Sequence, residues 1–235
     1  MIYKILKSLP IIFALMLFNS FNAQVKINWK LDLSRKNAII TLNNESNKNI
    51  VIPIDTLSLQ PYYSDNYHIS EIDWIDQYPF FGLTINIYDN PDKKNIETQL
   101  HSHIDLSEFD NIKAKNDSIK KEFNTRIKKW RMNNNVQQIN ANINYYIMNN
   151  LLFLKAKEKI TFSVPLNLEN ITNRENGPLQ GFYVLNNEKK NIGYLSIYIN
   201  KNIYIKYLTD SQRETLRKYK LFVGKIVSNK IEIKQ

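Results

Sequence analysis

The chain has 235 residues, with 32 basic and 22 acidic side chains and a formal net charge of +10. It contains no cysteine, 5 glycines, 7 prolines and 43% apolar residues. This composition excludes disulfide scaffolds, cysteine zinc sites, thiol catalysis and collagen-like chains, and its apolar content argues against general disorder.

The first 23 residues have the three-part pattern of a secretory signal peptide. Lys4 and Lys7 supply the positive start, an apolar run extends from Leu9 to Phe18, and small residues lead to Ala23. The run is about ten residues long, roughly half of what a membrane-spanning helix needs. The sequence therefore predicts an exported protein, periplasmic or secreted, whose mature part (24–235) has no transmembrane segment. Because no cysteine lies at the cleavage site, it predicts no lipoprotein.

Three apolar segments near the start predict strands. Residues 25–33 alternate between apolar and polar side chains, which indicates a strand with one buried face. Residues 38–43 and 50–54 are β-rich, and the polar sequence NESNKN between them predicts a turn. Pro53 cannot donate a ladder hydrogen bond, so the third strand is expected to end there or to lie at a sheet edge.

The middle of the chain changes from strand-like to helical patterns. Residues 59–78 are aromatic and acidic and are expected to form a loop or short helix, and residues 80–88 alternate as a strand. The apolar spacing across 119–130 predicts one buried face of an α-helix. Residues 133–150 fit a helix or a strand, and their lack of Gly and Pro favours the helix. We therefore expect a helical insertion at about 112–150.

Strand patterns return towards the end of the chain, at 159–166, 194–199 and 202–207. Thr209 begins a short helix, and Gln212 three residues later is typical of a capping box. Two closing strands, 220–227 and 230–234, are expected to flank a hairpin turn at Ser228-Asn229.

The order of these elements predicts a mainly β fold, an immunoglobulin-like antiparallel sandwich with a helical insertion (α+β overall), in a single domain at 24–235. With its signal peptide and the segments TLNNESNKNIVIPI and LKAKEKITFSVPL, the chain resembles exported immunoglobulin-like proteins of unknown function from AT-rich bacteria. The resemblance implies the sandwich fold and supplies no functional residues.

Charge is segregated along the chain. Residues 50–110 carry a net −9, residues 111–235 carry +14, and the stretch 113–131 alone carries +6. Such a run attracts anions, pairs with an acidic part of the same fold, or forms a solvated surface. The residues predicted to contact an anionic partner are Lys120, Lys121, Arg126, Lys128 and Lys129, with Trp130 as an anchor at a lipid interface.

Two histidines form the second candidate site. His101 and His103 have the spacing that places two imidazoles on one face of a strand, which suits zinc or copper. The acidic residues at 65–76 suggest a calcium site or an acid–base pair acting on a glycan, but the regular calcium-loop motif is missing. Two exposed loop histidines and a solvated acidic loop are the simpler interpretations.

No nucleophile motif or phosphate-binding glycine loop is present in the sequence. We therefore predict no catalytic residues, no cofactor and a non-enzymatic binding or interaction module of the bacterial envelope or exterior. Its partner is open between an anionic envelope surface and another envelope protein, and nucleic acid is disfavoured. The alternatives are a secreted metal-dependent or glycan-acting hydrolase and an envelope inhibitor or chaperone-like protein.

Overall fold

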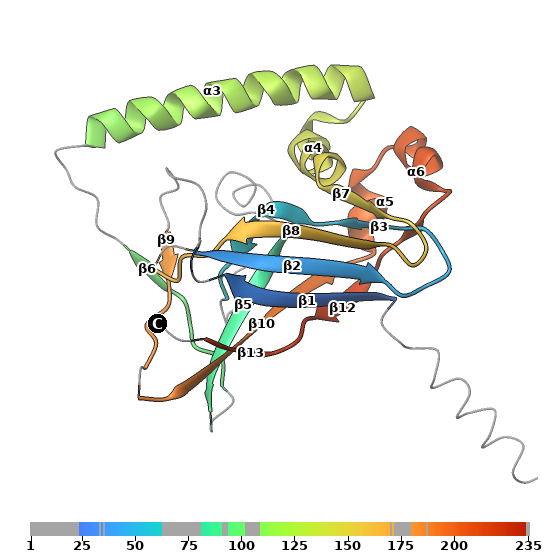
Figure 1. Cartoon of the computed structure of the whole chain (residues 1–235). Coiled ribbons are helices and arrows are strands. Elements are labelled where there is room, and N and C mark those ends of the chain that lie inside the picture. The colour runs from blue at the N-terminus through green and yellow to red at the C-terminus, as the bar shows by residue number, and fades with distance from the viewer. Residues whose placement is uncertain are drawn as a thin grey trace, which may run out of the picture.

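The computed structural model describes residues 24–32, 34, 36–62, 81–90, 94–101, 109–169, 171, 180–186 and 188–233. These residues form an α+β fold, which confirms the mixed class expected from the sequence. In Figure 1 the strands form the body of the molecule, and the helices lie together along one side of it. The predicted signal peptide, residues 1–23, lies outside the described residues.

The first sheet contains the two strands nearest the N-terminus. Strand β1 (Val25–Asp32) pairs antiparallel with β2 (Asn37–Asn44), and β2 pairs antiparallel with β8 (Lys159–Pro165). The alternation that predicted β1 is observed, since Val25, Ile27 and Trp29 are buried and the residues between them are exposed.

The largest sheet in the described part of the chain is built around β10 (Lys190–Ile199). One edge of β10 pairs antiparallel with β5 (Gly82–Asn90), and its other edge pairs with both β12 (Gly224–Val227) and β13 (Ile231–Ile233). Strand β4 (Asp55–Gln60) completes the sheet by pairing parallel to β5.

Two smaller sheets complete the strand pairing of the described residues. Strand β3 (Ile50–Pro53) lies between β7 (Leu151–Leu154), which is antiparallel to it, and β11 (Lys220–Leu221), which is parallel to it. Strands β6 (Gln99–His101) and β9 (Gln180–Phe182) form an antiparallel pair. As expected from its missing N–H, Pro53 ends β3.

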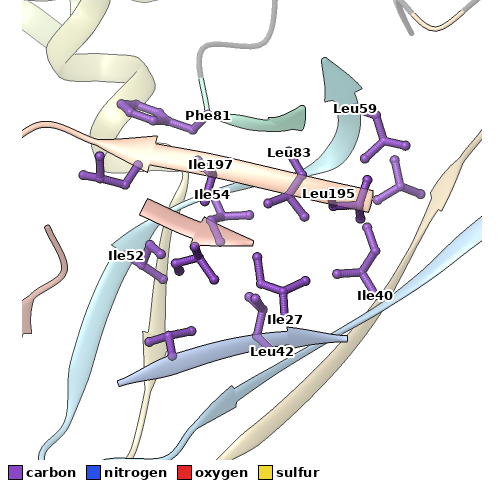
Figure 2. Close-up of a cluster of buried hydrophobic side chains, with 14 of the residues drawn as sticks. Ile27, Ile40, Leu42, Ile52, Ile54, Leu59, Phe81, Leu83, Leu195 and Ile197 are labelled. Carbon is purple, nitrogen blue, oxygen red and sulfur yellow. The ribbon is translucent and has the colours of Figure 1, made fainter. Parts of the chain in front are cut away.

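The buried faces of the two larger sheets contribute to one hydrophobic cluster. Figure 2 shows Ile27 and Leu42 of the first sheet pointing towards Leu83 and Leu195 of the second. The sheets also contact each other at their edges, because β8 lies beside β4 and β1 lies beside β12. Because the chain has no cysteine, this shared core stabilises the fold without disulfides.

Five helices lie among the described residues. They are α3 (Phe109–Asn134), the 3₁₀ helix η3 (Gln138–Asn140), α4 (Ala141–Asn149), α5 (Asn202–Tyr207) and α6 (Asp210–Leu216). The helix expected across 119–130 is therefore present and longer than its pattern, and 141–149 adopts the favoured helical alternative. The capping box of α6 is present, because Thr209 Oγ1 accepts from Gln212 N–H and Gln212 Oε1 accepts from Thr209 N–H.

Several strand predictions near the C-terminus are wrong. Residues 202–207 form α5, since burying Ile203, Tyr204 and Tyr207 on one helical face serves the core better than alternation. Segment 220–227 divides into β11 and β12, with Gly224 at a φ of 119° where the chain changes direction. No hairpin forms at Ser228-Asn229, because β12 and β13 both pair with β10.

The purely antiparallel arrangement expected from the sequence is also wrong. The pairs β4–β5 and β3–β11 are parallel. The sequence pattern could not reveal this, because alternation specifies which face of a strand is buried and not the direction of its neighbour.

Candidate functional site

The basic stretch of the sequence forms α3, a helix of 26 residues. It ends at a left-handed turn: Asn135 has a φ of 49°, and the N–H of Val136 donates to Arg131 O at 3.2 Å. This is the bonding pattern of a Schellman cap, in which asparagine tolerates the positive φ. The turn directs the chain back towards η3 and α4.

Only the C-terminal half of α3 packs against the rest of the described protein. Ile127 is buried in a small cluster with Val136 and Ala141, separate from the main core. The rings of Phe123 and Trp130 meet Tyr145 of α4 edge-on, at centroid distances of 6.4 and 5.4 Å. Before Phe123, every α3 side chain that the structure describes is exposed. In Figure 1 α3 accordingly extends well beyond α4.

The five bases predicted to contact an anion are all exposed, but they do not share one side of the helix. Lys121 and Lys128 are two turns apart and lie on the same side, and Lys120 is beside them. These three lysines line a shallow surface hollow with Asp117, Asn124 and Thr125. Arg126 and Lys129 lie on another side of the helix.

The lysines of this hollow form no ion pair within the described part of the chain. Asp117 is the one acid among the six lining residues, so the hollow carries a net +2. In the rest of the described chain, bases on α6 and at its C-cap do have acidic partners: Arg213 pairs with Asp210 and Arg217 with Glu214. The basic side of α3 is thus electrostatically uncompensated by its described surroundings.

Trp130, the expected lipid anchor, is half-buried in the contact between α3 and α4. Its indole N–H donates to Asn144 Oδ1 at 2.8 Å. The anchoring role stays a prediction, while the observed contact shows that Trp130 holds α3 in place.

A buried pair of amides extends this contact to the other helices. Asn144 Nδ2 donates to Gln212 Oε1 at 2.6 Å and to Tyr207 O at 2.7 Å, and Gln212 Nε2 donates back to Asn144 Oδ1 at 3.1 Å. With the Trp130 bond, all four hydrogen-bonding positions of the Asn144 amide are used. The network therefore links α3, α4, α5 and α6. No sequence pattern indicated it, since Asn144 is one of many asparagines in an Asn-rich segment.

The proposed metal site falls largely outside the described residues. The backbone of His101 ends β6, but its side chain is not described, and His103, His68 and the acidic residues 65–76 are all in undescribed segments. Among the described residues, no group of three or more His, Asp or Glu side chains is arranged to hold a metal ion. The histidine and carboxylate hypotheses therefore stay predictions.

The described helices include none that is long and apolar enough to cross a membrane. Comparison with known proteins gives no relative: no family model, no curated protein and no solved structure matches the chain.

Proposed function

We propose that the protein is an exported, non-enzymatic binding module that contacts an anionic partner in the bacterial envelope or outside the cell through α3. The observation that carries this proposal is the exposed lysine group Lys120, Lys121 and Lys128, which has no ion pair among the described residues, on a helix that projects from the body. A rigid array of cations without acidic partners attracts an anionic surface and raises the rate of encounter with it.

Export is supported by the signal-peptide pattern of residues 1–23. For the scaffold we propose a sandwich in which β1, β2 and β8 face β5, β10 and β12. The single core shared by these strands supports this arrangement, as does the sequence resemblance to exported immunoglobulin-like proteins. The parallel pair β4–β5 is a departure from that family's strand pairing.

Charge reversal on one side of α3 tests the proposal. In the double variant Lys121→Glu/Lys128→Glu we expect affinity for immobilised heparin at low salt to fall about tenfold or more, because like charges then face the polyanion. The readout is the salt concentration at which the protein elutes.

Two matched controls carry the same change in net charge. The variant Arg126→Glu/Lys129→Glu alters another side of α3, and Lys26→Glu/Lys30→Glu alters exposed positions on β1. We expect the β1 variant to elute at close to the same salt concentration as the unmodified protein. The Arg126/Lys129 variant should elute between the unmodified protein and the Lys121/Lys128 variant. Equal elution of the β1 variant and the Lys121/Lys128 variant would contradict a role for α3.

A further inference from the structure

The meeting point of α3, η3 and α5 carries three large apolar side chains that are exposed to solvent. Met132 is 70% exposed, Ile139 76% and Ile205 59%. Isolated exposed apolar residues are ordinary, but these lie on segments held against one another. Arg131 donates to Gln138 Oε1 at 2.8 Å, and Asn140 Nδ2 donates to Lys206 O at 3.4 Å.

Met132 continues the basic side of α3. Met132 follows Lys128 by four residues and Lys121 by eleven, so the three side chains form a row along one side of the helix. We call Met132, Ile139 and Ile205, together with Lys121 and Lys128, the α3 tip. It combines exposed apolar side chains with cations that pair with no described acid, as interfacial helices do.

We propose that the α3 tip docks on the surface of a lipid bilayer with anionic headgroups. The lysines contact lipid phosphates, and Met132 and Ile139 enter the boundary between headgroups and acyl chains. This inference rests on the proposed function and adds the class of partner to it.

The apolar half of the tip favours a bilayer over a soluble polyanion. Polysaccharides and nucleic acids supply negative charge, but neither offers a hydrocarbon phase into which methionine and isoleucine side chains can move. Single-stranded nucleic acids are usually held by aromatic side chains on which their bases stack. In the described part of α3 the aromatic rings, Phe123 and Trp130, pack on Tyr145 instead.

The buried amide network gives the tip a fixed shape before it meets a membrane. Asn144 holds Trp130 of α3 and the carbonyl of Tyr207 at the end of α5, so the segments that carry Met132 and Ile205 are joined through one residue. Docking then requires little ordering of the protein, which favours binding by a small surface.

Vesicle binding tests the inference. In co-sedimentation at low salt, we expect the protein to bind vesicles of phosphatidylcholine and phosphatidylglycerol at least about tenfold better than phosphatidylcholine alone. The variant Met132→Gln/Ile139→Gln should lose about tenfold of this binding while its heparin elution is unchanged. The matched control Val184→Gln/Val227→Gln alters exposed apolar residues elsewhere and should keep both its vesicle binding and its heparin elution unchanged. Every variant is prepared in the same form, so any contribution of residues 1–23 is common to all.

A fluorescence measurement gives a second readout. Because the chain has no cysteine, Ile139→Cys provides a unique site for a polarity-sensitive fluorophore. Its emission should shift to the blue on anionic vesicles, whereas the same label at Val184→Cys should not shift.

The outcomes separate the two proposals. If Met132→Gln/Ile139→Gln binds vesicles as well as the unmodified protein and the Ile139→Cys label does not shift, the bilayer inference is overturned and the anion-binding function stands. If Lys121→Glu/Lys128→Glu changes neither heparin elution nor vesicle binding, the proposed function fails and the bilayer inference fails with it.

Discussion

The hydroxyl of Tyr183 connects segments that are far apart in the sequence. It donates to Ile85 O at 2.7 Å and accepts from Tyr62 N–H at 2.8 Å, while Thr98 donates to Tyr62 O at 2.6 Å. Burial raises the pKa of Tyr183 to about 12, against a smaller opposing effect of its hydrogen bonds. Burial also raises the pKa of Tyr204, whose hydroxyl donates to Phe222 O.

These two tyrosines predict a loss of stability in alkaline solution. Because the folded pKa of Tyr183 is above its unfolded value of 10, its stabilising contribution is complete below pH 10 and is lost as pH rises towards 12. We expect the urea midpoint to fall with pH in this range, and to fall less steeply in Tyr183→Phe, which cannot ionise at that position.

The measurement is urea unfolding at several pH values, combined with tyrosinate absorbance. The control is Tyr198→Phe, which removes the hydroxyl of an exposed tyrosine in place of a buried one. An identical pH dependence in Tyr183→Phe and the unmodified protein would contradict this assignment.

At the scale of elements, the contact between Asn144 and Trp130 determines where α3 lies. We expect Asn144→Leu to lower the free energy of unfolding by about 1–3 kcal/mol, because Nε2 of the buried Gln212 and the indole N–H of Trp130 lose their shared acceptor, Asn144 Oδ1. Urea unfolding measures this cost. Hydrogen exchange should also show α3 losing protection relative to β5 and β10.

The matched control for this prediction is Asn142→Leu on the same helix. Asn142 is half-buried and lies outside the amide network, so its replacement should cost much less. Equal stability of the two leucine variants would show that the network does not hold the helices together.

Individual elements differ in how far the sequence predicts them. Alternation predicted β1 because one face of the strand is buried, a β-rich apolar run predicted β2, and the capping box predicted α6 because both of its bonds are local. The strand expected at 202–207 is wrong because its β-favouring residues also fit a helix, and packing buries Ile203, Tyr204 and Tyr207 on one helical face. A short segment satisfies both periods, and only its tertiary neighbours decide between them.

Of the features of the candidate site, the sequence predicted only its basic charge. The sequence showed the basic run, but not that Trp130 packs against Tyr145 and bonds to Asn144. The exposed residues Ile139 and Ile205 belong to the α3 tip through contacts between η3 and α5, and no local pattern specifies such contacts.

At the scale of the whole molecule, Asn229 joins the two larger sheets. Its side-chain amide bonds to the backbone of Trp29 as a neighbouring strand would: Oδ1 accepts from Trp29 N–H at 2.7 Å, and Nδ2 donates to Trp29 O at 3.0 Å. Its backbone carbonyl accepts from the Trp29 indole at 3.0 Å. Gly193 leaves the space for this junction, since a Cβ there would lie 2.3 Å from Ile233 Cδ1 and 3.3 Å from Trp29 Cζ2.

This junction predicts that Asn229→Ala loosens β1 from the rest of the structure. Two backbone groups of Trp29 lose their partners, so we expect a loss of about 1–3 kcal/mol in the free energy of unfolding and faster hydrogen exchange along β1. Asn229→Asp should cost at least as much, since it keeps an acceptor but places a carboxylate against the Trp29 carbonyl. The control Asn43→Ala removes one exposed bond to Glu45 and should change neither quantity appreciably. Unaltered β1 exchange in Asn229→Ala would mean that the shared hydrophobic core alone keeps the sheets together.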